Sequence, residues 1–254
     1  LRLTGPITAY NVHLFASYVL TWVLMAVLCL ELTRDRAAAT VGGAVFTFCA
    51  NRSLHAVAGH LTQVLTYAYP LLVYCLWRAV KQPSVWRGLL LAGATVAVST
   101  LDLMPLAYFA APVTILTLIH FLLHDREQVL SAPALRTLGI GFGVTALVVL
   151  PFLWPLASKG LRGELAFYQA AGINEYSADA LALFVPPPGH LICSLWPALW
   201  HFSAQLIAEE AYMESIVYAG WVTLGLAAWG AANGWDRHKD VPLWVAVAVG
   251  ASIL

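Results

Sequence analysis

Long apolar runs, each closed by a short charged cluster, are the feature that most limits how this chain can fold. The first run extends from about residue 10 to residue 32 and ends at Arg34, Asp35 and Arg36. A helix needs about 20 predominantly apolar residues to cross the hydrocarbon layer of a bilayer. A membrane β-barrel would instead show alternating segments of roughly ten residues. The pattern therefore predicts an all-α fold, a polytopic bundle of transmembrane helices.

The composition agrees with that class and excludes others. Of the 254 residues, 61% are hydrophobic and only 10% are charged, whereas a soluble domain has about 25% charged residues. Such high hydrophobicity also excludes intrinsic disorder. The net charge is zero, so the chain has no basic field for nucleic acid and we expect no nucleic-acid partner. The four cysteines form no CxxC pair, and we expect neither a disulfide nor a metal site.

The apolar runs predict about seven spanning helices and a truncated last one. They cover residues 10–32, 37–50, 61–80, 85–101, 105–123, 135–157 and 213–232, and the last helix begins near residue 242. Residues 1–254 would form a single transmembrane domain, with a long outer loop at 158–212 that holds short amphipathic helices. Because the chain starts at Leu1 and its last apolar segment is too short to span, we interpret it as an internal fragment of a longer protein.

The distribution of Lys and Arg predicts the orientation. If the loop at Arg34 is cytoplasmic and the helices alternate, nine of the 13 basic residues lie inside, as the positive-inside rule requires. The remaining four, Arg2, Arg52, Lys159 and Arg162, then lie outside. We therefore expect a multi-pass protein integral to the cytoplasmic membrane. Its chemistry would lie on the extracytoplasmic face, where the long loop is.

The first candidate site is the cluster of Arg52, His55 and His60 at a predicted helix boundary. One guanidinium and two imidazoles could bind a phosphate through charge-assisted hydrogen bonds. The alternative is an interfacial loop whose histidines simply face water.

Two carboxylates form the next candidates. Asp102 ends an apolar helix, where it could face an outer cavity or cap the following helix. Glu214 shares a helix face with Tyr218 and could contact a sugar hydroxyl. The alternative for Glu214 is an acid that the helix macrodipole stabilises near the N-terminus.

The outer loop contributes Lys159, Arg162 and His190. Loops of about fifty residues are more often functional than idle. Contact with lipid headgroups remains the alternative for the basic pair.

The order and spacing of four segments resemble the polytopic membrane glycosyltransferases of the C-type superfamily, which use polyprenyl-phosphate sugars. The four are Gly5 to Asn11, Asn51 to Leu61, Tyr176 to His190, and Glu214 to Gly220. The resemblance implies transfer of a sugar to a lipid or protein acceptor at the outer face, with membrane lipid and a polyprenyl-phosphate-linked sugar as partners. It implies phosphate contacts for Arg52, His60, Lys159 and Arg162, and sugar or acceptor contacts for Asp102 and Glu214.

The same resemblance places the catalytic carboxylate in an outer loop ahead of Leu1, so no catalytic residue is assigned. No cofactor is required, and a divalent cation is the only one left open. Two other functions remain: a flippase or transporter of a lipid-linked substrate, and a non-catalytic membrane assembly protein. The glycosyltransferase hypothesis predicts that Arg52, His60, Asp102 and Glu214 converge on one outer cavity.

Overall fold

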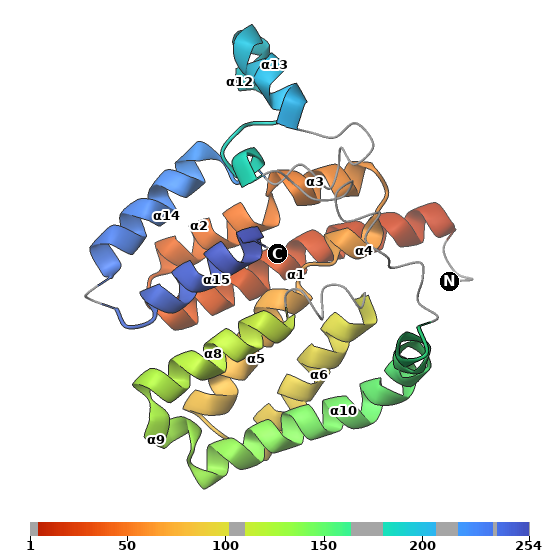
Figure 1. The fold of residues 1–254 in the computed structure, drawn as a ribbon, viewed down its shortest axis with the longest axis vertical. Helices are drawn as coiled ribbons and strands as arrows, with labels where there is room; N and C mark the ends of the chain where they lie inside the picture. Colours follow the sequence, from red (N-terminus) through yellow and green to blue (C-terminus); the bar gives the residue numbers. More distant parts are fainter. Residues whose placement is uncertain (1–4, 102–109, 164–179, 207–217, 236–237, 254) are drawn as a thin grey trace.

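The computed structural model describes residues 5–101, 110–163, 180–206, 218–235 and 238–253, and all regular structure within them is helical (Figure 1). This confirms the all-α prediction. The first half of the chain contains α1 (Pro6–Thr33), α2 (Arg36–Thr47), α3 (Ala50–Val57), α4 (Leu61–Val64), α5 (Ala68–Lys81), α6 (Val85–Leu101) and α8 (Ala111–His124). The second half contains α9 (Arg126–Val129), α10 (Ala132–Leu161), η4 (Ala180–Leu183), α12 (Leu191–Leu195), α13 (Pro197–Leu206), α14 (Trp221–Gly234) and α15 (Val241–Ile253).

Two of these helices, α1 and α10, are long and apolar enough to cross a membrane. Their surfaces expose large apolar side chains, including Phe15 at 72% and Phe152 at 79%, as expected of helices that face lipid rather than water. The helices α6 and α8 are apolar but shorter, with 17 and 14 residues. A 14-residue helix is about 21 Å long, less than the hydrocarbon thickness of about 30 Å. A membrane protein is thus supported by length and composition, whereas seven spans are not confirmed.

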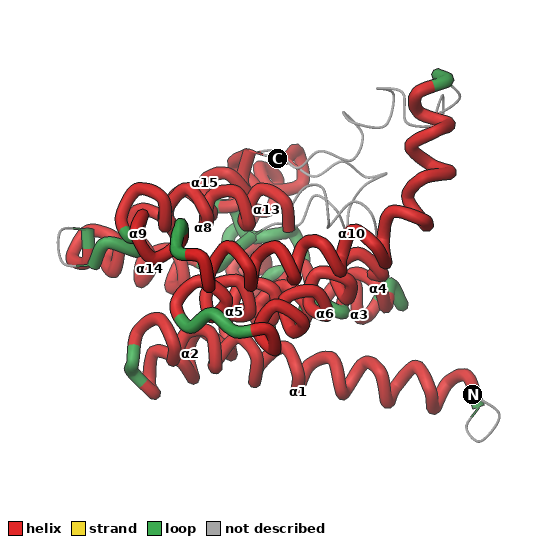
Figure 2. Tube along the Cα trace, turned by 90° about the horizontal axis from the view of Figure 1, so that it is seen from below, coloured by secondary structure: helices red, strands yellow, loops and turns green. Residues whose placement is uncertain are grey.

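The core is built around α5, the most buried of the longer helices. Its side chains Leu72, Leu76 and Val80 are at most 1% exposed, and α1, α6, α8 and α10 all pack against it. The helices α6 and α10 approach closely because Gly88 and Gly141 lie where they meet. Figure 2 shows α10 bending near its C-terminal end, where Pro151 and Pro155 interrupt the helical hydrogen bonds.

The second predicted helix, 37–50, ends three residues earlier than expected. The helix α2 begins at an Asp35 cap, whose carboxylate accepts from Ala37 N at 2.7 Å, and it ends at Thr47. The chain turns at 48–49 and continues as α3. Gly59, at φ +80°, then separates α3 from α4.

Two other predicted helices differ from the observed ones. The predicted helix 61–80 is divided into α4 and α5 by a turn at 65–67. The predicted helix 213–232 corresponds to α14, which starts at Trp221, directly after Gly220 at φ +88°. Residues 213–217 lie outside the described part of the chain. Within the predicted loop 158–212, the structure places the end of α10 and the short helices η4, α12 and α13.

Candidate functional site

Arg52 is buried between α1, α2 and α4, where its guanidinium connects three separate pieces of chain. Its Nε donates to the Val64 carbonyl at 2.9 Å and its Nη1 to the Thr47 carbonyl at 2.8 Å. Its Nη2 donates to Ser17 Oγ at 2.7 Å, and the guanidinium carbon lies 4.0 Å from the centre of the Tyr18 ring. The residue is only 1% exposed. Arg52 therefore belongs to the framework of the helix break, and a headgroup could reach it only if these contacts opened.

The helix ends explain why an arginine fits there. The last carbonyls of a helix have no N–H partner within the helix. Thr47 is the last residue of α2 and Val64 the last of α4, so both leave a buried carbonyl to satisfy. The five donors of a guanidinium, fixed in a fork, can reach several such acceptors at once.

His55 and His60 face each other at the end of α3, as the sequence grouped them. Their Nδ1 atoms lie 3.2 Å apart, and the turn at Gly59 brings them together by letting His60 N donate to the His55 carbonyl at 2.9 Å. A hydrogen bond between two imidazole nitrogens needs one protonated and one unprotonated atom. The pair can therefore hold one excess proton while keeping its hydrogen bond. His55 is buried at 5% exposure, whereas His60 is exposed.

An apolar groove of about 530 Å³ lies between α1 and α2. Its walls are Phe15, Tyr18, Val19 and Trp22 from α1, Thr40 and Ala44 from α2, and Phe48 from the turn after α2. At one end of the groove the Tyr18 and Phe48 rings meet at 5.7 Å between centroids. Because the same Tyr18 ring lies against Arg52, this end of the groove adjoins the helix break that carries the histidine pair.

His190 and Tyr218 are brought together although 28 positions separate them. Their rings meet edge to face at 5.5 Å between centroids. His190 Nδ1 accepts from Ile192 N at 3.2 Å, and the buried Tyr218 hydroxyl accepts from Trp221 N at 3.2 Å. Trp221 Nε1 in turn donates to the Phe184 carbonyl at 2.7 Å. These contacts attach the segment around η4 and α12 to the start of α14.

Lys159 and Arg162 lie on the last turn of α10 and just after it, and both are exposed. Arg162 Nε donates to the Ser158 carbonyl at 3.2 Å, one turn earlier in the chain.

Asp102 and Glu214 lie outside the described residues. The predicted convergence of these two carboxylates with Arg52 and His60 therefore stays a prediction. Within the described part of the chain, no group of three or more His, Cys, Asp or Glu residues could hold a metal ion.

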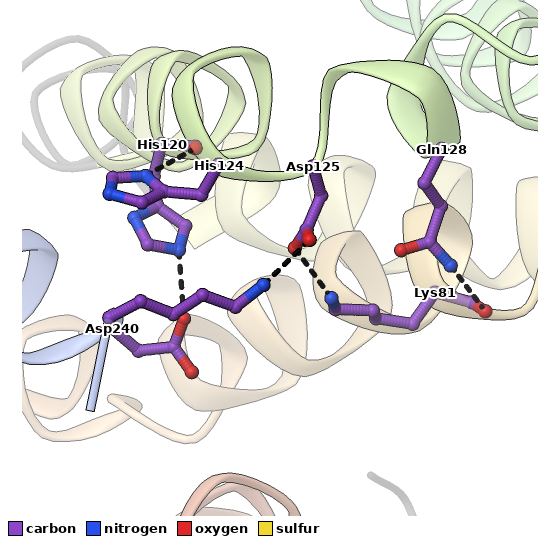
Figure 3. A network of polar contacts seen from close by, with 7 residues as sticks. Lys81, His120, His124, Asp125, Gln128 and Asp240 are labelled. Carbon is purple, nitrogen blue, oxygen red and sulfur yellow. Dashed lines mark hydrogen bonds and ion pairs between the residues drawn. The ribbon is translucent and has the colours of Figure 1, made fainter. Parts of the chain in front are cut away.

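A second polar cluster, which the sequence did not single out, joins the ends of α5, α8 and α15 (Figure 3). Asp125 accepts from Lys81 Nζ at 2.7 Å and from Lys239 Nζ at 2.6 Å, and Gln128 Nε2 donates to the Lys81 carbonyl at 3.2 Å. Burial alone would raise the pKa of the Asp125 carboxyl. The hydrogen bonds from Lys239 and Lys81 outweigh that effect and lower the pKa to about 2.

Beside this cluster, His120 Nε2 lies 2.8 Å from Asp240 Oδ1, and the imidazole is stacked on Trp77. Glu31, near the end of α1, binds Arg78 at 3.1 Å and Arg34 at 3.2 Å. All of these loops were expected on the inner face from their basic residues. The distribution of basic residues thus predicts that these loops share one face. It does not predict which carboxylate pairs with which cation.

Comparisons with known protein families, curated proteins and solved structures gave no match to this chain.

Proposed function

We propose that this chain is part of an integral membrane glycosyltransferase, with a polyprenyl-phosphate sugar as donor and a lipid or protein as acceptor at the outer face of the cytoplasmic membrane. The observation that carries the proposal is the groove between α1 and α2, one end of which is formed by Tyr18, whose ring lies against Arg52 of the helix break. The proposal also draws on the sequence resemblance to the C-type superfamily.

The groove suits an isoprenoid chain. Its lining is almost wholly apolar, so a polar or charged ligand would lose its hydration there without gaining hydrogen bonds in return. The helix α2 has only 12 residues and is about 18 Å long, and beyond its end the guanidinium of Arg52 lies against Tyr18 of the groove. An amphiphile with a long apolar tail and a compact anionic head matches that arrangement.

The histidine pair would bind the phosphate. His60 is exposed, and the pair can carry one excess proton without losing its internal hydrogen bond. An imidazolium donates charge-assisted hydrogen bonds to phosphate oxygens, which are roughly twice as strong as neutral ones. Arg52 acts indirectly, by holding the helix break in the shape that presents the pair.

The reaction would break the bond between the anomeric carbon and the phosphate oxygen and form a bond from that carbon to an acceptor hydroxyl. The bonding electrons leave with polyprenyl phosphate, and a base takes the hydroxyl proton. The residues of this chain are assigned to donor binding, and the base is not assigned among them.

The groove is tested by filling it. Ala44→Phe places a ring between α1 and α2, whereas Ala38→Phe makes the same change on the exposed face of α2, outside the groove. With the intact protein in detergent, binding of farnesyl phosphate and undecaprenyl phosphate would be measured for both variants. We expect at least a tenfold loss for Ala44→Phe and little change for Ala38→Phe. Equal binding by the two variants would refute the groove as the donor site.

The phosphate contact is tested with His60→Ala, and His13→Ala serves as control because it removes another exposed histidine of the same chain. We expect His60→Ala to reduce binding of farnesyl phosphate while leaving binding of farnesol unchanged. Transfer itself is followed as release of polyprenyl phosphate from hexose-linked and pentose-linked donors. Binding with no release from any donor would contradict the enzyme and favour a carrier of lipid-linked substrates.

A further inference from the structure

A second ligand site, distinct from the donor groove, lies between α5 and α6 near the turn that joins them. A pocket of about 240 Å³ is lined there by Tyr74, Cys75, Arg78, Trp86, Arg87 and Leu90. Its position along the molecule is fixed by Arg78, which binds Glu31 at 3.1 Å. Glu31 is 13 residues beyond Tyr18 on α1, roughly 20 Å along the helix axis. The pocket therefore lies at the other end of α1 from the helix break.

The two guanidiniums in this pocket retain donors for an anion. Of its five N–H donors, Arg78 uses those on Nη1 for Glu31. Arg87 turns Nη1 and Nη2 toward the carbonyl and the side-chain amide of Gln82. Among the described residues, the hydrogen bonds of Arg78 leave Nε and Nη2 uncommitted, and those of Arg87 leave Nε.

The local charge is also uneven. Glu31 is shared between Arg34 and Arg78, so among the described residues one carboxylate pairs with two guanidiniums, and the oxygens that Arg87 binds there are neutral. An anion entering the pocket would meet an excess of positive charge. Guanidinium groups with free N–H donors bind phosphate oxygens in pairs, with defined geometry.

The surface next to the pocket is apolar and outward-facing. Trp86 is 67% exposed, and Leu89 and Leu90 on the same helix are 42% and 46% exposed. Tryptophan at the end of a lipid-facing helix typically lies at headgroup level. The leucines that follow it on α6 would then lie at the depth of the acyl chains.

We propose that this pocket binds an anionic phospholipid, with its phosphodiester between Arg78 and Arg87 and an acyl chain along Trp86 and Leu90. Basic pockets between helices on the cytoplasmic side are known sites for acidic headgroups. The proposal rests on the chain lying in a membrane and goes beyond sugar transfer. The ligand here is a structural lipid at the inner end of the bundle.

The experiment measures lipid retention by native mass spectrometry of the intact protein, released from detergent supplied with phosphatidylglycerol or phosphatidylcholine of identical acyl chains. We expect the anionic lipid to bind at least fivefold more tightly than the zwitterionic one. Arg87→Gln should remove most of that preference. The control, Arg36→Gln, removes an exposed arginine at the same end of the molecule but outside the pocket, and should change the preference less than twofold.

Two further measurements distinguish a lipid phosphate from free phosphate, and the charge of Arg87 from the planar shape of its guanidinium. Inorganic phosphate at millimolar concentration should not displace phosphatidylglycerol, and displacement would overturn the lipid assignment in favour of a free-phosphate site. Arg87→Lys keeps the charge but loses the planar fork, and should give an intermediate preference. Equal preference in the wild type, Arg87→Gln and Arg36→Gln would overturn the proposal. Because the readout is lipid retention, this outcome would leave the sugar-transfer proposal untouched.

Discussion

Replacing Arg52 by Met should destabilise the helix break by about 4 kcal/mol. The substitution removes three hydrogen bonds of a charged donor, to Val64, Thr47 and Ser17, at 2.7–2.9 Å. Each such bond contributes about 1.5–3 kcal/mol, so the low end of this range gives about 4.5 kcal/mol for the three bonds before the gain in desolvation is subtracted. Loss of the contact with the Tyr18 ring adds to this cost, and the apolar methionine avoids the desolvation cost of burying a charge.

The loss is shared unequally among the three acceptors. Ser17 Oγ also donates to the Val64 carbonyl at 2.8 Å, so that carbonyl keeps one partner when Arg52 is removed. The Thr47 carbonyl at the end of α2 loses the charged donor at 2.8 Å. Ser17→Ala should therefore cost only about 1–2 kcal/mol. The double variant should cost less than the two single losses added together, because both remove the same contact.

The measurement is an SDS titration of the protein in mixed micelles, followed by helical ellipticity and by the reactivity of the buried thiol of Cys75. The matched control is Arg36→Met, which removes an exposed arginine and should change the free energy of unfolding by less than about 0.5 kcal/mol. If Arg52→Met lowered the free energy by less than about 1 kcal/mol and yet abolished binding of farnesyl phosphate, the assignment of Arg52 to the framework would be refuted. Arg52 would then be a direct phosphate ligand.

Four further changes test the packing and the polar contacts. Gly88→Ala should destabilise the α6–α10 contact by about 1–3 kcal/mol, because the new Cβ would lie 2.7 Å from the Thr137 carbonyl. Gly93→Ala, where nothing lies within 4 Å, should instead stabilise α6 by about 0.5–1 kcal/mol in the same titration. The lowered pKa of Asp125 means that its ion pairs stabilise the fold fully above pH 4 and are lost as pH falls toward 2, about 1 kcal/mol after allowance for solvent screening. In Asp125→Asn this pH-dependent loss should be absent, and an unchanged acid profile would contradict the assignment. Ser203→Ala removes a buried hydroxyl that donates to the Pro186 carbonyl at 2.7 Å. It should lower the stability of the α12–α13 segment by about 1 kcal/mol and so raise its rate of proteolytic cleavage.

The helical class of this chain was predictable because apolar run length is a property of sequence alone. The continuity of each helix was not. Residues 61–80 read as one uninterrupted apolar segment, yet the structure divides it at 65–67, and the helix expected at 37–50 already ends at Thr47. Phe48 and Cys49, which form the turn after Thr47, carry no Pro or Gly signal. At both places the freed helix-end carbonyls accept tertiary hydrogen bonds instead, from Arg52 at Thr47 and from Arg52 and Ser17 at Val64.

The inner charged cluster shows a similar division. Counting basic residues by loop indicated which turns should share a face, and the structure joins α5, α8 and α15 through Asp125. The counts treat acids as neutral in setting orientation, so they gave Asp125 no role. Its position became informative only when Lys81 and Lys239, 158 positions apart in sequence, were found on either side of one carboxylate.

In the cluster of Arg52, His55 and His60, the sequence did not predict which side chain is buried. Arg52, His55 and His60 are close in the chain, and the pattern predicted one polar group facing outward. The structure separates them by burial, because the partners of Arg52 are two backbone carbonyls and a serine hydroxyl rather than an acid. Every residue has a backbone carbonyl, so residue types do not show which carbonyls a helix end leaves without a partner. The pattern of side chains therefore could not predict that Arg52 is buried. The same helix ends that hold the Arg52 guanidinium leave His60 exposed, and for this reason the proposal assigns the phosphate to the imidazoles rather than to Arg52.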